Sequence, residues 1–214
     1  VITIRWNESL ERIESYKDKV KIEYVELTDL SSVIRAINKH RPDVISHLAA
    51  QSWVPYSFQN PIYTMKTNIE STLNILEAVR IVKDILAQNE SLQDYRNYSP
   101  LIHICSSSEF FGKVDRKDLP ITEDHKANPG NPYGISKVAG DFLAQIYAQY
   151  YDLRILITRM FTHTSERRTM LSAEHYYAKA IAEIEEDVGL LKHDKEYNIR
   201  IGNLKSIRTW RNVR

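Results

Sequence analysis

Short runs of β-branched and apolar residues alternate along this chain with longer segments in which apolar positions recur at helical spacing. The short runs predict strands, and the periodic segments predict helices. Strands are predicted at 1–5, 20–26, 43–49, 101–106, 153–160 and 197–201. Helices are predicted at 8–16, at 30–39 behind a Thr28/Asp29 cap signal, and at 61–82, 133–150 and 172–187.

This alternation of strands and helices favours the α/β class, with a doubly wound parallel sheet covered by helices on both faces. In such sheets the functional site lies beyond the carboxyl ends of the strands. Polar segments follow three of the predicted strands, at 49–52, 106–109 and 161–168. We therefore expect these three segments to meet at one edge of the sheet.

The composition narrows the possible partners. Lys plus Arg number 29 and Asp plus Glu number 28, so no excess of either sign points to nucleic acid or to an anionic membrane. No apolar run is long enough to span a bilayer, and we expect a soluble, cytoplasmic protein.

Cys105 is the single cysteine, and the histidines are not at ligand spacing, so we expect no disulfide and no metal. Cys105 fits a buried strand end, and a reactive thiol is the alternative.

Tyr133 and Lys137 are the strongest candidates for chemistry. Residues four apart on a helix share one face, and a neighbouring ammonium lowers the pKa of a phenol. Tyr133 would then be usable as a general base near neutral pH. A hydroxyl of the cluster at 106–108 would hold the substrate oxygen. The alternative is an ordinary solvated helix face.

The glycine pattern departs from a complete dinucleotide-binding fold. Such a fold opens with a strand, a Gly-rich turn and a helix that receives the pyrophosphate. This chain has six glycines, and none forms GxGxxG. The segment 1–5 resembles the second strand of such a fold, and 207–214 has no closing element. We expect an internal part of a longer protein, with a sheet incomplete at its N-terminal edge. A complete small α/β domain is the alternative.

Seven motifs in order identify a family resemblance. The chain resembles an extended short-chain dehydrogenase/reductase with a Rossmann-like fold, and within that group a GDP-mannose 4,6-dehydratase. The resemblance implies an NAD(P)-binding domain at 1–160 and the start of a small nucleotide-sugar-binding lobe at 161–214. The motifs are ELTD at 26–29, HLAAQS at 47–52, TNIEST at 67–72, SSSEFFG at 106–112, YGISK at 133–137, FTHTSERR at 161–168 and IGNLKSIRTW at 201–210.

The resemblance also implies catalytic roles. Tyr133 would take the proton of the sugar 4-hydroxyl, while Lys137 would hold the nicotinamide ribose and lower the Tyr133 pKa. Ser107 would hydrogen-bond the 4-oxygen. Glu109 would remove the C5 proton after oxidation, and a surface loop carboxylate is the alternative. Ser108 matches the GDP-mannose enzymes, because dTDP-glucose dehydratases resembling this motif have Asp there.

Cofactor contacts are implied at two places. Arg5 stands at the end of the strand where an acidic residue would bind an NAD ribose, so NADP is favoured and NAD remains possible. A solvated strand end is the alternative for Arg5. The residues implied for the adenine and for the loop beside the pyrophosphate are Glu26, Leu27, Leu48, Ala49, Ala50 and Gln51.

A GDP-sugar is the implied substrate. Its expected contacts are Ser108, Thr162, His163, Arg168, Lys179 and Arg208, with Arg208 on the diphosphate. Two residues depart from the family pattern: Thr162 replaces an Asn, and Thr169 replaces a Gly. A related GDP-sugar such as a GDP-heptose, another epimerase or reductase of this family, and a non-catalytic fragment are the alternatives.

Two helices carry apolar positions that suit either a core or a subunit interface. The resemblance implies that these helices pair with a second subunit in a homodimer or homotetramer. The positions are Ile69, Leu73, Leu76 and Val79 on one helix, and Phe142, Ile146 and Tyr147 on the other.

Overall fold

The computed structural model describes residues 1–5, 10–165, 172–189, 196–199, 201 and 211–212. The chain divides into two compact units, Val1–Met160 and Phe161–Arg214. The first unit holds the sheets and helices that position the candidate site.

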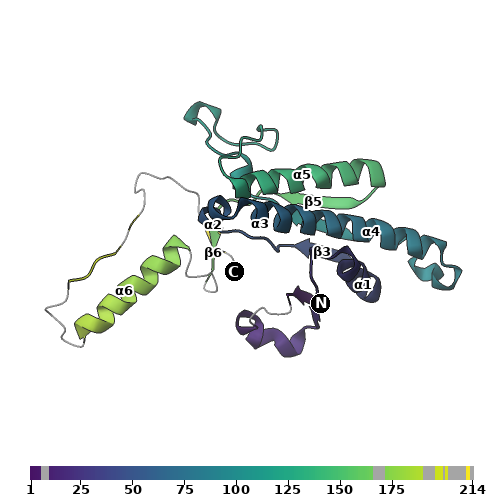
Figure 1. Ribbon diagram of the computed structural model, residues 1–214, viewed down its shortest axis with the longest axis horizontal. Coiled ribbons are helices and arrows are strands. Elements are labelled where there is room, and N and C mark those ends of the chain that lie inside the picture. The colour runs from purple at the N-terminus through teal and green to yellow at the C-terminus, as the bar shows by residue number, and fades with distance from the viewer. Residues whose placement is uncertain (6–9, 166–171, 190–195, 200, 202–210, 213–214) are drawn as a thin grey trace. The chain divides into compact units, whose positions relative to one another are not determined.

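The described strands of the first unit are all parallel and form two sheets (Figure 1). One sheet pairs β1 (Ile2–Ile4) with β2 (Ile22–Tyr24). The other has the order β3 (Val44–His47), β4 (Leu101–Cys105) and β5 (Arg154–Thr158). The α/β class and the parallel pairing are confirmed, although the strands form two sheets here rather than one.

Helix α1 (Leu30–His40) begins at the predicted cap. The Asp29 carboxylate accepts a hydrogen bond from the Ser31 backbone N–H at 3.0 Å, which satisfies one of the first-turn donors. The helix ends at Arg41 in the left-handed conformation. Its buried residues Val33 and Ile37 lie four apart and face the core.

The predicted helix 61–82 is divided into three pieces and extends further. It comprises α3 (Pro61–Met65), the π-helical turn η2 (Lys66–Glu70) and α4 (Ser71–Gln88). A preceding short helix, α2 (Val54–Gln59), was not predicted. A π-helical turn often marks a functional site, and this one carries the buried Asn68.

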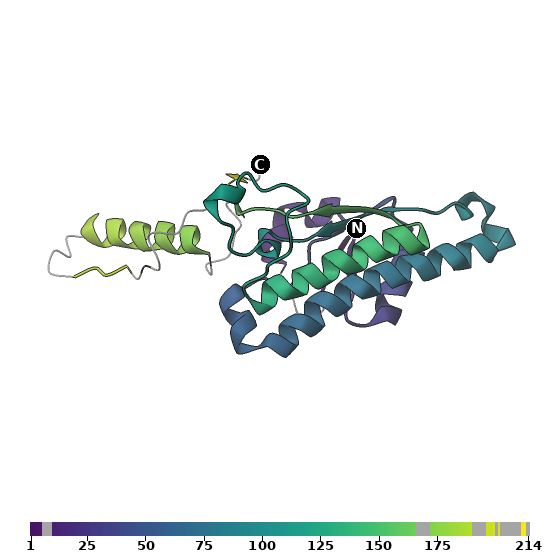
Figure 2. The ribbon, with the colours of Figure 1, turned by 90° about the horizontal axis from the view of Figure 1, so that it is seen from above.

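Helix α5 (Pro132–Tyr151) runs beside α4 along one face of the three-stranded sheet (Figure 2). The core between them includes Leu76 and Val79 of α4, Ile102 and Ile104 of β4, and Ala144 of α5. On the opposite face of the sheet Val44 is 59% exposed and Leu156 is 48% exposed. The described helices of this unit therefore cover one face of these strands, where two covered faces were expected.

Short 3-10 helices complete the first unit. They are η1 (Glu11–Lys19), η3 (Glu90–Tyr95), η4 (Ser108–Phe110) and η5 (Arg116–Asp118). The short helix predicted at 8–16 is a 3-10 helix shifted toward the C-terminus, with residues 8 and 9 outside the described residues.

The second unit contains helix α6 (Ala173–Gly189) and a parallel pair of short strands, β6 (His163–Thr164) and β7 (Arg211–Asn212). The strand predicted at 197–201 is wrong at 197–199 and 201, which have no regular structure, and residue 200 lies outside the described residues. Strand pairing in this unit instead joins segments nearly fifty residues apart, which local pattern does not reveal. In the described part of the chain, no helix has the length and apolar character needed to cross a membrane.

Candidate active site

The end of β4 and the start of α5 bring four predicted residues together. Ser107 follows β4 by two residues, and its Oγ accepts a hydrogen bond from the Glu109 backbone N–H at 3.2 Å. The Ser107 side chain also hydrogen-bonds the phenol of Tyr133 on α5. Lys137 lies one helical turn after Tyr133, and its Nζ donates to the Cys105 carbonyl oxygen at 2.6 Å.

The pKa of Tyr133 differs from the expectation. Burial raises it above its ordinary value, the hydrogen bond with Ser107 acts in the opposite direction, and the nearby Cys105 and Glu109 raise it further. Burial lowers the pKa of Lys137. The expected lowering of the Tyr133 pKa by Lys137 is therefore absent here. The ammonium is directed at the strand carbonyl, and desolvation disfavours the phenolate.

Glu109 is attached to the first turn of α5. Asn131 Nδ2 donates to Glu109 Oε2 at 2.7 Å, and Asn131 Oδ1 accepts from the Gly134 backbone N–H at 2.7 Å. The backbone also approaches closely here, because a Cβ on Gly134 would lie 2.9 Å from the Glu109 carbonyl oxygen. Glu109 and Tyr133 are thus held on two elements in direct contact.

A buried ion pair packs against the turn that carries Glu109. Asp141 of α5 is fully buried, and its Oδ2 accepts from Arg159 Nε at 2.9 Å. The Arg159 guanidinium lies 3.8 Å from the ring centroid of Phe110 and also donates to the Glu123 carbonyl oxygen at 2.7 Å. Arg159 therefore connects the end of β5, helix α5 and the turn that carries Glu109.

A second buried network joins the loop after β3 to the start of α5. Asn68 in η2 accepts from the Gln51 backbone N–H at 2.7 Å and donates to the Gln51 carbonyl at 3.0 Å and to Ser136 Oγ at 2.9 Å. Ser136 in turn donates to the Tyr133 carbonyl oxygen at 2.7 Å. One amide thereby sets the position of the loop relative to the turn that carries Tyr133.

His47 at the end of β3 is buried beside the same network. It hydrogen-bonds Thr72 Oγ1 at 3.1 Å. Burial, followed by the charge of Lys137, lowers the pKa of His47 to about 3. The His47 imidazole is therefore neutral near pH 7, and the Lys137 ammonium carries the positive charge beside it.

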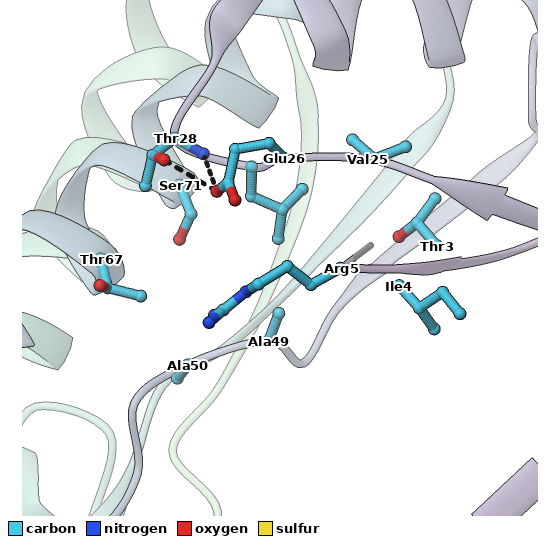
Figure 3. A pocket seen from close by; sticks show the side chains of 11 residues that line it. Thr3, Ile4, Arg5, Val25, Glu26, Thr28, Ala49, Ala50, Thr67 and Ser71 are labelled. Atoms are coloured by element: carbon cyan, nitrogen blue, oxygen red, sulfur yellow. Dashed lines mark hydrogen bonds between the residues drawn. The ribbon is translucent and has the colours of Figure 1, made fainter. Parts of the chain in front are cut away.

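A pocket opens where the carboxyl ends of β1 and β2 face the loop after β3 (Figure 3). Its volume of about 270 Å³ is just below the roughly 300–1,000 Å³ of whole ligand pockets, which suits part of a dinucleotide. The predicted residues in its lining are Arg5, Glu26, Leu27, Ala49 and Ala50, and the lining also includes Thr28, Thr67 and Ser71.

Arg5 and Glu26 give this pocket its charge. The Glu26 carboxylate accepts from the Thr28 hydroxyl at 2.8 Å and from the Thr28 backbone N–H at 3.1 Å. These two hydrogen bonds, with a smaller contribution from Arg5, lower the pKa of Glu26. The pocket therefore presents a guanidinium and an ionised carboxylate at adjacent strand ends.

Other predicted residues lie elsewhere. Leu48 is 63% exposed, and neither it nor Gln51 lines the pocket. Thr162, His163 and Lys179 belong to the second unit, where Lys179 Nζ lies 3.6 Å from the Glu183 carboxylate on α6. Arg168 and Arg208 lie outside the described residues.

The apolar helix positions are divided between core and surface. Leu76, Val79 and Tyr147 are buried and belong to the core. Phe142 and Ile146 are 49% and 48% exposed on α5.

Sequence reasoning did not find the supporting polar residues. Asn131 had a detectable signal, because Asn directly before Pro at the first helical position is typical of an N-cap. Asn68 lay within a motif used for the resemblance, but nothing local reveals its hydrogen bonds to Gln51 and Ser136. The pairing of Asp141 with Arg159 joins residues 18 apart and had no signal.

The chain matches the family model described as GDP-mannose 4,6 dehydratase over residues 2–214. It is 32% identical over 189 residues to the GDP-mannose 4,6-dehydratase of Yersinia enterocolitica, covering 88% of this chain and 45% of that protein. A GDP-mannose 4,6 dehydratase of Drosophila melanogaster is 30% identical over 192 residues, covering 90% of this chain and 43% of that protein. The chain therefore spans less than half the length of these curated relatives.

Solved structures share the fold. RMD from Pseudomonas aeruginosa complexed with NADPH has a TM-score of 0.72 at 24% identity and covers 94% of this chain and 65% of that chain. DesIV, a dTDP-glucose 4,6-dehydratase from Streptomyces venezuelae with NAD and TYD bound, has a TM-score of 0.68 at 19% identity and covers 82% of this chain and 49% of that chain. These likenesses show that the fold is Rossmann-like. The match of the family model to nearly the whole sequence shows that the chain belongs to the GDP-mannose 4,6-dehydratase family.

Proposed function

We propose that the full-length protein dehydrates a GDP-sugar, converting GDP-mannose to GDP-4-keto-6-deoxymannose. The observation that carries this proposal is the placement of a carboxylate, Glu109, beside the Ser107–Tyr133 pair. Oxidation at one carbon needs a single base, whereas elimination needs a second base for a second proton. A phenol and a carboxylate held on adjoining elements meet that requirement.

Each residue has a separate task. Ser107 hydrogen-bonds the sugar 4-oxygen, and Tyr133 accepts the proton of the 4-hydroxyl. Lys137 offers its ammonium to the nicotinamide ribose and, in that complex, favours the Tyr133 phenolate. Glu109 then removes the C5 proton, which the new 4-ketone acidifies, and water leaves from C6. The proton taken at C5 and the hydroxide lost at C6 leave as one molecule of water, and the proton taken from the 4-hydroxyl balances the one that C5 regains when the hydride is returned to C6.

NADP is the proposed cofactor, and the pocket residues fit it. The Arg5 guanidinium suits a ribose 2′-phosphate, and Glu26 and Leu27 would lie at the adenine. Ala49 and Ala50 of the lining, with Leu48 and Gln51 beside them in the same loop, would lie on the pyrophosphate side. When bound, NADP would supply the acceptor for the C4 hydride and the donor for its return to C6. The neighbour RMD is complexed with NADPH and DesIV with NAD, so NAD is the second candidate.

The substrate contacts are proposed from the family resemblance. We assign Ser108, Thr162, His163, Arg168, Lys179 and Arg208 to the GDP-sugar. Thr162 and Thr169 depart from the family pattern, so a related GDP-sugar such as a GDP-heptose is the alternative substrate. We also propose a homodimer or homotetramer, with the exposed Phe142 and Ile146 as its apolar contacts.

A reductase is the second candidate function. A GDP-6-deoxy-D-mannose reductase of Pseudomonas aeruginosa is 33% identical over 122 residues, covering 57% of this chain and 36% of that protein. A reductase needs Tyr133 and Lys137 but has no C5 proton to remove. The role of Glu109 therefore distinguishes the two candidates.

The test compares Tyr133→Phe with Glu109→Gln in the full-length protein. Tyr133→Phe should stop the first oxidation, so that no reduced nicotinamide forms from GDP-mannose. Glu109→Gln should still form reduced nicotinamide in a single turnover but fail to exchange the C5 hydrogen with solvent deuterium. Loss of either base should lower turnover by about 10²- to 10⁴-fold.

Glu14→Gln on η1 is the matched control, since its carboxylate is largely exposed and distant in sequence from the site. It should leave both readouts unchanged. Full turnover and full C5 exchange by Glu109→Gln would remove the dehydratase proposal and leave the reductase. We also expect the isolated 214-residue chain to be inactive.

A further inference from the structure

Asn131 uses both ends of its side-chain amide at the candidate site. Its oxygen caps α5 through the Gly134 N–H, and its nitrogen donates to the Glu109 carboxylate, each at 2.7 Å. A cap alone needs only the oxygen. The second hydrogen bond reaches 22 residues back along the chain, to the turn after β4.

The two residues that Asn131 joins are neighbours of the reacting groups. Gly134 directly follows Tyr133 in the first turn of α5. Glu109 lies in η4, and Ser107 is the N-cap of that helix. The Asn128 backbone N–H also donates to the Phe110 carbonyl oxygen at 2.9 Å, so the segment before α5 is attached to this turn at a second point. The amide therefore fixes the carboxylate relative to the phenol.

The geometry of the contact suits a base. A general base must lie within hydrogen-bond reach of the proton that it removes. The Asn131 N–H restricts rotation of the Glu109 carboxylate, so that its orientation is set before substrate arrives.

We propose that Asn131 is a positioning residue for Glu109: it orients this carboxylate for the C5 proton. The inference rests on the proposed dehydratase function. It predicts that changes at Asn131 act on the elimination step and leave the first oxidation, which belongs to Tyr133, intact.

Asn131→Ser in the full-length protein separates the two roles of the amide. Serine retains the capping oxygen, but its single short hydroxyl cannot also reach Glu109. Loss of a hydrogen bond to a charged group should lower C5 exchange and turnover by about 10- to 100-fold. The single-turnover yield of reduced nicotinamide and the melting temperature should remain close to those of the parent.

Asn131→Asp tests the N–H donor itself. Aspartate is close in shape to asparagine and also caps a helix, but it has no N–H to donate to Glu109. C5 exchange should fall at least as far as in Asn131→Ser, while the single-turnover yield of reduced nicotinamide remains close to that of the parent. A residue with a purely structural role would not separate these two readouts.

Asn89→Ser is the matched control. Asn89 caps η3 through the Ser91 N–H at 3.0 Å, away from the site, and its replacement should leave C5 exchange and the yield of reduced nicotinamide unchanged. If Glu109→Gln abolishes exchange while Asn131→Ser and Asn131→Asp match the parent, the inference is wrong and the dehydratase proposal stands. If Glu109→Gln itself exchanges fully, both are wrong.

Discussion

The side of the site around Tyr133 is buried and densely hydrogen-bonded, whereas the pocket beside Arg5 is open. Ser107, Ser136 and Asp141 are at most 9% exposed, and each has a side-chain hydrogen bond across elements or within its own turn. In the pocket, Arg5 and Glu26 are exposed at the ends of short strands.

This difference follows from the two proposed tasks. Proton transfers need reacting groups held at fixed distances in surroundings of low dielectric constant, where each hydrogen bond has a larger effect. Recognition of one part of a cofactor needs matching charge and shape at a surface and tolerates more exposure. Mutations on the buried side should therefore change folding stability, while those in the pocket should change ligand preference.

The largest effect is expected from breaking the buried ion pair. Asp141→Ala leaves the Arg159 guanidinium without its carboxylate, which should lower the free energy of unfolding by about 3–5 kcal/mol. Urea unfolding of the full-length protein measures this change. Asp84→Ala is the control, because Asp84 pairs with Arg80 on the surface of α4 at 58% exposure and should cost at most about 1 kcal/mol. Equal costs for the two variants would contradict the comparison.

His47 should make the buried side sensitive to acid. Its pKa is lowered to about 3 in the folded protein from the ordinary 6.5. Between these values the unfolded chain binds the additional proton, so the free energy of unfolding should fall as pH decreases from about 6.5 toward 3. One residue contributes at most about 1.4 kcal/mol per pH unit to this slope. His47→Gln should reduce the slope in urea unfolding series, and an unchanged slope would show that other groups produce it.

The smallest effect on folding stability is expected from a mutation in the open pocket. Arg5→Ala in the full-length protein should reduce the preference for NADP over NAD by about 10-fold, with little change in the melting temperature. Binding titrations with both cofactors measure this ratio. Arg35→Ala on the exposed side of α1 is the control and should keep the preference. Equal affinities for the two cofactors in the parent would remove the proposed role of Arg5.

The sequence alone determined the local elements and the family, and it predicted the reacting groups. Apolar periodicity placed α1, α5 and the strands β3, β4 and β5 within a few residues, and the Asp29 cap signal was confirmed. Ordered motifs identified the family, because their spacing reflects the strand ends and helix starts that carry the site. These features depend on neighbours within one turn or one strand.

Tertiary structure alone decided the rest. The π-helical turn at Asn68, the Asp141–Arg159 pair and the Asn131–Glu109 hydrogen bond join segments that are distant in sequence or invisible to periodicity. The direction of the Tyr133 pKa shift was also decided there. A Lys four residues away predicted a lower pKa, but burial raises it, and Lys137 reaches a carbonyl of β4 instead. Desolvation depends on everything packed around a group, and that information is absent from any single stretch of sequence.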